Sequence, residues 1–334
     1  MPDKIDHEGR LFPYLISGLF DENTDICNMC YELIEEIGLR HEEYPENEVK
    51  LRELKQFGFK SEWTYDGLIT DDKVTLPAPI VTRPRLGSRI LVRSYVRRYL
   101  KALYKELADW IEISQERAVK LLMYSICYVE EFMTQYMDHL LVAIYKAIQN
   151  KENKIVQKHI VISCRLLGRY VKASQYSPFI IRAIRNELAS FYSYTASGSL
   201  LTYGYMIAGS IELLQPEQNI GNVADSLKEF VKAVEETVID SLDIETAAIL
   251  VKSLSVIVEE MIKKQSEGVD VQHIQEHLPK FVDFIMKCYG AYVTYKIQRK
   301  EDPESIKEHK KAADKLLEDL TKLAKNKERD LFDQ

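Results

Sequence analysis

Residues 11–38 read LFPYLISGLF DENTD ICNMCYELIEEIG, which is an apolar segment, a short polar stretch and a second apolar segment closed by a glycine. The same plan returns at residues 139–168, which read HLLVAIYKAI QNKENK IVQKHIVISCRLLG. A glycine after the last apolar turn is typical of a helix C-terminus, and the polar stretch between the segments is typical of a connecting turn. Each of the two stretches therefore predicts a pair of antiparallel helices.

This plan recurs along the chain. Turns between paired helices are expected near residues 21, 109, 150, 195 and 240. Their spacing is roughly 40 to 45 residues, with one interval about twice as long, and this is the period of HEAT repeats. No segment has the alternating pattern of a β-strand. The sequence therefore predicts an all-α fold, an α-solenoid of HEAT-type antiparallel helix pairs in which each pair buries its apolar face against its neighbours.

The array is expected to cover residues 1–300, with an irregular insertion at about 41–87 that accounts for the long interval. Prolines at 45, 77, 79 and 84 interrupt a continuous helix there. Residues 301–334 are rich in lysine and glutamate and carry only a thin stripe of leucines. This pattern predicts a charged helix that caps the C-terminal end of the array.

The stretch RPRLGSR at 83–89 and the apolar-periodic run after it are the second informative region. Ser88 is expected to cap a helix over residues 90–110. One basic row recurs every four residues along this helix, drifting about 40° around it at each step. Such a row is usually a solvated face, and the alternative is a surface for an acidic partner, because arginine forks bind carboxylates in a bidentate way. The candidate partner-binding residues are Arg89, Arg93, Arg97, Lys101 and Lys105.

Composition restricts the functional class. The 334 residues include 45 Lys and Arg against 52 Asp and Glu, which gives a formal net charge of −7 and no general attraction to nucleic acid or anionic lipid. The apolar runs are far shorter than a bilayer span, and the opening residues MPDKIDHE do not form a secretory leader. We therefore expect a soluble, cytoplasmic protein with neither a nucleic-acid partner nor a membrane partner.

Common enzyme signatures are missing from the sequence, including the dinucleotide fingerprint, the phosphate loop and the nucleophile elbow. HIQEH at 273–277 matches a zinc-hydrolase pattern that would use His273 and His277 as ligands. An ordinary helix start is favoured, because a third ligand is not evident and LeuPro follows. The five cysteines, two of them in CNMC at 27–30, are expected to be reduced core thiols. No catalytic residue, metal or cofactor is predicted, and the chain is not expected to be an enzyme.

Several short motifs, taken in order, resemble the HEAT-repeat dynein axonemal assembly factor family, the fifth of the numbered assembly factors. They are RP-x-LG-x-R at 83–89, DW at 109–110, RAVKLL at 117–122, HL at 139–140, LLGRYV at 166–171 and SP at 177–178. The resemblance is clearest from about residue 10 to 215. Members of that family are longer solenoids, so this chain looks like their C-terminal portion.

The resemblance implies a non-enzymatic factor for the cytoplasmic preassembly of axonemal dynein arms in motile cilia. It also implies partners: axonemal dynein heavy and intermediate chains, other dynein assembly factors and chaperones. No active-site residues carry over from the family. The alternative is a generic HEAT scaffold of a transport, phosphatase or microtubule complex, which would share the repeat period but not the arrangement of motifs at 83–110.

Overall fold

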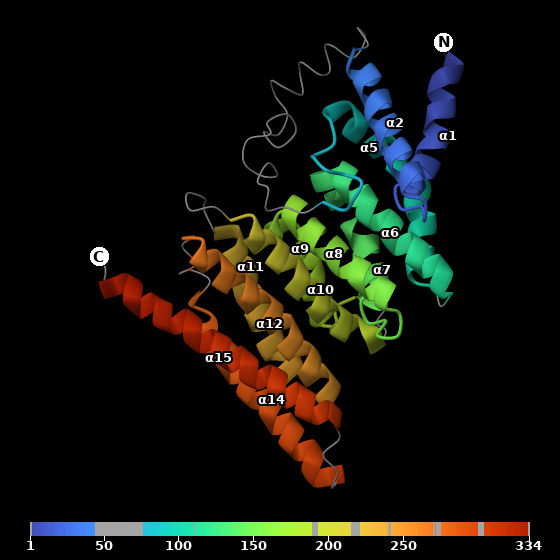
Figure 1. Cartoon of the computed structure of the whole chain (residues 1–334). Helices are drawn as coiled ribbons and strands as arrows, with labels where there is room; N and C mark the ends of the chain where they lie inside the picture. Colours follow the sequence, from blue (N-terminus) through green and yellow to red (C-terminus); the bar gives the residue numbers. More distant parts are fainter. Residues whose placement is uncertain are drawn as a thin grey trace. The chain divides into compact units, whose positions relative to one another are not determined.

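The computed structural model describes residues 2–43, 76–109, 111–188, 193–214, 221–239, 242–269, 271, 275–299 and 304–332 (Figure 1). Throughout these residues the regular elements are helices, and they follow one another in pairs separated by short turns. The all-α class expected from the sequence is confirmed. The chain divides into two compact units, which are described separately.

The first unit comprises residues 1–133 together with 158–163. Its described helices are α1 (Pro2–Gly18), α2 (Thr24–Glu43), α5 (Leu86–Leu107) and α6 (Glu112–Val129). Helix α1 packs on α2, α5 and α6, while α2 packs on α5 and α5 on α6. Apolar side chains at helical spacing, such as Phe12 and Ile16 of α1, are fully buried in this unit.

The second unit comprises residues 134–157 and 164–334, so that helix α8 contributes residues to both units. Its described helices are α7 (Met137–Ala147), α8 (Lys154–Tyr170), α9 (Ala173–Ile184), α10 (Ser193–Glu212), α11 (Gly221–Ala233), α12 (Ile244–Ser266), α14 (Leu278–Arg299) and α15 (Glu304–Phe332), with a π-helical turn at Val234–Val238. A 3₁₀ segment at Glu130–Tyr136 has residues in both units. Helix α9 packs on α7, α10 and α11, and α12 packs on α10, α14 and α15. Helices of successive pairs are therefore stacked on one another, as a repeat fold requires.

The turns expected near residues 21, 109 and 150 fall between helices, and these predictions are confirmed. The turn expected near 240 falls on a residue outside the described ranges. The turn expected near 195 is wrong, because Ser193–Glu212 is one helix, α10. Two glycines of α10 lie where the helix packs closely against neighbouring helices. A Cβ on Gly198 would overlap the carbonyl oxygen of Tyr145, and a Cβ on Gly209 would overlap that of Arg165, so these two positions let α10 lie against neighbouring backbone.

The start of α5 also differs from the expectation. The helix covers Leu86–Leu107 with Arg85 at the N-cap, whereas residues 90–110 with a Ser88 cap were expected. Ser88 lies within the first turn of α5 and is fully buried, and its hydroxyl donates to the carbonyl oxygen of Ile34 at 3.1 Å. The serine therefore ties α5 to α2 rather than capping its own helix.

The expected insertion lies mostly outside the described residues, which resume at residue 76, and its role stays a prediction. At the other end, α15 buries a stripe that includes Ile306, Leu316 and Leu323 against its neighbours, and many of its charged residues are exposed. A capping role for residues 301–334 likewise stays a prediction. None of the described helices has the length and apolar character needed to cross a membrane.

All five cysteines are free thiols. Cys27, Cys127, Cys164 and Cys288 are buried, and Cys30 is half-buried. Burial raises the pKa of the Cys30 thiol, with the neighbouring Cys27 as a second cause, and it raises the pKa of Cys288 to about 12. A raised pKa keeps a thiol protonated and unreactive, which agrees with the expectation of core thiols.

Candidate partner-binding surfaces

The stretch at 83–89 joins α5 to α2 through backbone groups. The amide of Arg85 donates to Oε2 of Glu35 at 3.1 Å, and the amide of Gly87 donates to Oε1 of Glu42 at 2.7 Å. The first amides of a helix have no acceptor within the helix, and the N-terminus favours negative charge. The two carboxylates of α2 therefore satisfy the start of α5 from across the helix interface.

Two glycines allow α2 and α5 to approach this closely. A Cβ added to Gly87 would overlap the carbonyl oxygen of Gly38, and a Cβ added to Gly38 would overlap the backbone of Ser88. Both glycines are buried. The glycine of the 83–89 motif is therefore explained by main-chain contact between two helices.

The arginines of the same stretch meet one buried carboxylate. Arg83 donates from Nε and Nη2 to the two oxygens of Glu130, each at 2.7 Å. Arg89 Nη1 and Arg93 Nη2 donate to Oε2 of Glu130 at 2.9 and 3.2 Å. We call these four residues the Glu130 cluster. The exposed fraction is 6% for Arg83 and 2% for both Arg89 and Glu130, so the cluster holds α5 and the residues before it against the end of α6.

Burial lowers the pKa of Arg89, and Arg83 and Arg93 lower it further, while Glu130 acts in the opposite direction. Because the pKa of an arginine starts so high, the guanidinium remains charged. Arg89 also donates from Nε to the carbonyl oxygen of Pro84 at 3.0 Å. The Arg93 guanidinium lies 4.1 Å from the ring centre of Phe132, a cation–π contact.

The predicted basic row therefore divides in two. Arg89 and Arg93 point into the Glu130 cluster, whereas Arg97, Lys101 and Lys105 are exposed. The drift of about 40° per step carries the row from the inner side of α5 to solvent. Arg98, which the four-residue spacing passed over, is also exposed, and its guanidinium lies 5.0 Å from the ring centre of Tyr95.

We call Arg97, Arg98, Lys101 and Lys105 the exposed basic face of α5. Partner binding by the predicted basic row stays a prediction. It applies to the residues of the row that are exposed to solvent, and not to Arg89 and Arg93. The sequence signal that could have added Arg98 to the row is its position directly after Arg97. By contrast, no sequence pattern predicted a role for Glu130. This residue directly follows α6, and its own backbone φ is 54°.

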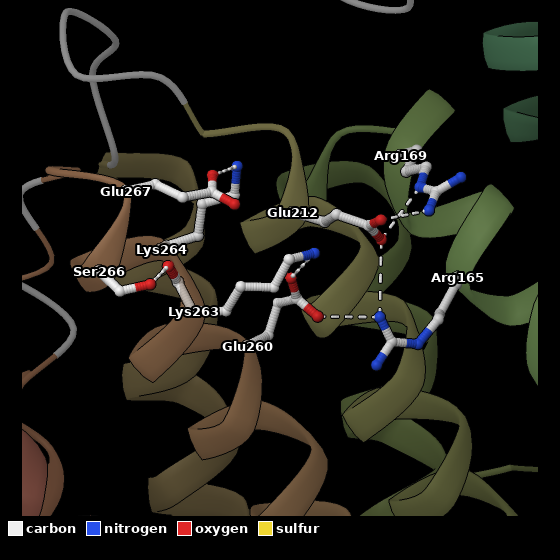
Figure 2. Close-up of polar contacts among 8 residues, drawn as sticks. All are labelled: Arg165, Arg169, Glu212, Glu260, Lys263, Lys264, Ser266 and Glu267. Atoms are coloured by element: carbon white, nitrogen blue, oxygen red, sulfur yellow. Dashed lines mark hydrogen bonds and ion pairs between the residues drawn. The ribbon is translucent and has the colours of Figure 1, made fainter. Parts of the chain in front are cut away.

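The second unit contains a chain of alternating charges that Figure 2 shows across three helices. Arg169 of α8 donates from Nε to Glu212 of α10 at 3.1 Å. Arg165 of α8 lies 3.5 Å from Glu212 and donates to Glu260 of α12 at 2.9 Å, and Lys263 lies 3.3 Å from Glu260. These five residues form the α8–α12 network.

Both carboxylates of the network are largely shielded from water, since the side chains of Glu212 and Glu260 are 10% and 6% exposed. A shielded carboxylate is tolerated when it is paired and hydrogen-bonded. Each carboxylate here has at least one arginine partner. The network therefore fixes the register of α8, α10 and α12 with respect to one another.

The zinc hypothesis concerned His273 and His277. His273 lies outside the described residues, so the pair stays untested. His277 is half-buried, and burial lowers its pKa, opposed by a hydrogen bond to the backbone of Ala224. In the portion of the chain that the structure describes, no three His, Cys, Asp or Glu side chains are grouped so that they could hold a metal ion.

Comparison with known proteins identifies relatives of this chain. The family model described as the HEAT-repeat domain of dynein axonemal assembly factor 5 matches residues 75–269. Dynein axonemal assembly factor 5 of Xenopus laevis is 22% identical over 326 residues, which cover 90% of this chain and 37% of the relative. The human protein of that name is 26% identical over 214 residues, covering 64% of this chain and 23% of the relative. The mouse protein is 23% identical over 218 residues, with 65% and 23% covered.

The chain thus spans between about a quarter and about two fifths of the length of these relatives. The matched residues 75–269 contain the 83–89 stretch, the Glu130 cluster, the exposed basic face and the α8–α12 network. The match also confirms the HEAT-type α-solenoid expected from the repeat period. Because it extends over more than half of the chain, the chain belongs to the dynein axonemal assembly factor 5 HEAT-repeat family.

Proposed function

We propose that this chain is a non-enzymatic scaffold segment for the cytoplasmic preassembly of axonemal dynein arms. The observation that carries the proposal is the family match over residues 75–269, whose relatives are named for dynein assembly. Helix pairs stacked in series supply many separate contact surfaces on one chain. Such a fold suits a factor that holds large protein subunits together during assembly.

The surface that we assign to partner binding is the exposed basic face of α5. Arg97, Lys101 and Lys105 lie on successive turns, about 6 Å apart along the helix. The chain as a whole carries a formal charge of −7, so this face is a local concentration of positive charge. It would attract an acidic surface of a partner, and arginine forks would add geometric specificity.

The proposed partners are axonemal dynein heavy and intermediate chains, other dynein assembly factors and chaperones. The test is affinity capture with this chain from a ciliated cell, with the cytoplasmic fraction separated from the axonemes. Unassembled dynein chains should be recovered from the cytoplasmic fraction. Recovery of nuclear-transport, phosphatase or microtubule subunits in their place would contradict the proposal and favour a general HEAT scaffold.

A further inference from the structure

Helix α14 of the second unit has one exposed face that carries apolar side chains. The helix packs on α12 and α15, which Figure 1 shows beside it, and its other side includes the fully buried Phe281 and Phe284. On the exposed face lie Val282, Met286 and Val293, of which Met286 is 58% exposed. Single exposed apolar residues are common on protein surfaces, but several on one face indicate a contact surface.

The exposed face is formed by five positions, namely Pro279, Val282, Met286, Gly290 and Val293. At about 100° per residue, all five fall within about 40° of Met286 around the helix axis. Successive positions are three, four, four and three residues apart. This spacing reads the same in both directions along the helix. We call these five residues the α14 stripe.

A spacing that reads the same in both directions matches a second copy of the same helix that runs antiparallel. With a twofold axis at Met286, the two Met286 side chains meet, and Val282 of one copy lies opposite Gly290 of the other. Among the described residues nothing lies within 4 Å of a Cβ added to Gly290, so a larger side chain has room there. Pro279 of one copy likewise lies opposite Val293 of the other. A twofold contact uses the same patch on both copies, and the α14 stripe is complementary to itself.

The charges beside the α14 stripe are also complementary to those of a second copy. Asp283 and Lys287 lie on the same flank of the stripe, both exposed, and form an ion pair at 3.5 Å within the helix. In the antiparallel pairing these flanks face each other, and Asp283 of each copy lies about 3 Å along the axis from Lys287 of the other. The two pairs of opposite charge between the copies outnumber the one pair of like charge, which is between the two lysines.

The size of the α14 stripe determines how strong such a pairing can be. From Pro279 to Val293 the stripe covers about 21 Å of helix. With a helix diameter of about 10 Å, the contact is on the order of 200 Å² per copy, against about 800 Å² per partner in a typical stable complex. The association is therefore expected to be weak and to depend on protein concentration.

We propose that the α14 stripe is a self-association surface, through which two copies of this chain pair antiparallel about a twofold axis at Met286. The occupant is a second copy because the spacing of the stripe, the space beside Gly290 and the charges of its flank all complement themselves. The proposal goes beyond the dynein-assembly role and does not rest on it. Self-association can be measured on the purified chain without any dynein subunit.

The first test is sedimentation equilibrium of the whole chain at concentrations from roughly 10 µM to 1 mM, which covers weak dissociation constants. The average mass of the parent should rise from that of a monomer toward that of a dimer. Met286→Glu places two like charges on the twofold axis, so its association constant should fall about tenfold or more. Met29→Glu, at an exposed apolar position of α2, is the control and should associate like the parent. Circular dichroism checks that each variant folds.

The second test reverses the charges of the flank. Asp283→Lys and Lys287→Asp each leave only like charges facing one another between the copies, so each should weaken the association. Combining the two substitutions restores opposite charges with their positions exchanged, and the double variant should recover most of the association of the parent. A double variant that associates no better than either single variant would contradict the antiparallel arrangement.

The third test measures the register by disulfide formation in air, since a disulfide needs Cα atoms within about 7 Å of each other. Met286→Cys should form a covalent dimer. Val282→Cys and Gly290→Cys should each fail alone, because each residue lies about 12 Å along the axis from its equivalent in the other copy. A mixture of these two variants should cross-link. The parent, whose five cysteines are buried or half-buried, measures the background.

The proposal is overturned if the parent remains monomeric throughout the concentration range, or if folded Met286→Glu associates as strongly as the parent. It is also overturned if Val282→Cys cross-links with itself as readily as with Gly290→Cys. None of these results bears on the capture of dynein chains, which tests the exposed basic face of α5. The two proposals can therefore fail independently.

Discussion

Glu130 is the residue that three arginines share, and its replacement gives the first prediction. In Glu130→Gln the shape is kept but the negative charge between Arg83, Arg89 and Arg93 is lost. Breaking a buried ion pair by removing one partner typically costs about 3 to 5 kcal/mol. We expect a loss of that size in the free energy of unfolding, measured by urea denaturation. Glu32→Gln, at an exposed position of α2, is the control and should change stability by no more than about 0.5 kcal/mol. A Glu130→Gln variant as stable as the control would mean that the cluster contributes little.

Removing the negative charge of Glu35 should have the opposite effect on stability. Burial raises the pKa of its carboxyl group, opposed by the hydrogen bond from Arg85, and its Oε1 has no hydrogen-bond partner among the described residues. Because the folded-state pKa lies above the unfolded value, ionising Glu35 in the folded protein reduces stability. That loss is absent below the unfolded pKa of 4.5 and fully present above the folded pKa.

Glu35→Gln should therefore increase the free energy of unfolding at pH 7, since the amide oxygen still accepts from Arg85. The increase should shrink as the pH falls toward 4.5. Urea denaturation of the parent and the variant at pH 7 and pH 5 measures the difference. If the parent and the variant differed in stability by the same amount at both pH values, or if the variant were less stable at pH 7, the raised pKa of Glu35 would be contradicted.

At the scale of helices, the chain offers a matched pair of glycines. Gly87→Ala would drive a methyl group into the backbone of Gly38, so α2 and α5 would have to separate, which typically costs about 1 to 3 kcal/mol. Gly290 lies in α14 with nothing within 4 Å of an added Cβ. Gly290→Ala should therefore increase stability by up to about 1 kcal/mol through helix propensity. Melting temperatures of the two variants should move in opposite directions, and a shift of the same sign would refute the close-contact interpretation of Gly87.

The exposed basic face of α5 gives a prediction about binding. Replacing Arg97, Lys101 and Lys105 with Glu should leave helix content nearly unchanged, because exposed substitutions typically change stability by only about 0.5 kcal/mol each. Capture of dynein chains from cytoplasmic extract should fall. In the parent protein, capture should weaken as salt is added, since the attraction between exposed charges is screened.

The matched control for this experiment reverses exposed lysines elsewhere, namely Lys228 and Lys232 on α11 together with Lys287 on α14. This control should capture the same partners as the parent at the same salt concentration. A folded α5 variant that also captures them would show that the basic face is solvated and has no partner. Arg93 is left unchanged in both variants, because its replacement would disturb the Glu130 cluster.

At the scale of the whole chain, stability depends on neighbouring repeats holding one another in place. Leu167 of α8 is fully buried in the second unit, so Leu167→Ala should cost about 2 to 5 kcal/mol by leaving a cavity. Hydrogen exchange should show faster opening in the C-terminal turns of α8 and in α10 before it rises elsewhere. Ile155→Ala, on the same helix but 43% exposed, is the control. Equal melting temperatures for the two variants would mean that the packing of α8 is less tight than described.

The repeat period and the apolar spacing were sufficient to predict helix pairs, most of the turns and the buried thiols, because these depend on residues close in sequence. The turn predicted near 195 lies inside α10. A glycine such as Gly198 can either end a helix or allow a neighbouring backbone to approach, and which of the two applies depends on a helix distant in sequence. The inward direction of Arg89 and Arg93 depends on Glu130, about 40 residues away.

The contact between Gly38 and Gly87 has a consequence for how the sequence can change over generations. A Cβ on Gly87 would overlap the carbonyl group of Gly38, and a Cβ on Gly38 would overlap the hydroxyl and the amide of Ser88. A larger residue at position 87 or 38 therefore cannot be accommodated by a smaller one at the other. Substitutions at one of these positions therefore cannot be compensated by substitutions at the other. Methods that infer contacts from correlated substitutions would therefore register little signal at the α2–α5 crossing, although the two helices touch there through their backbones.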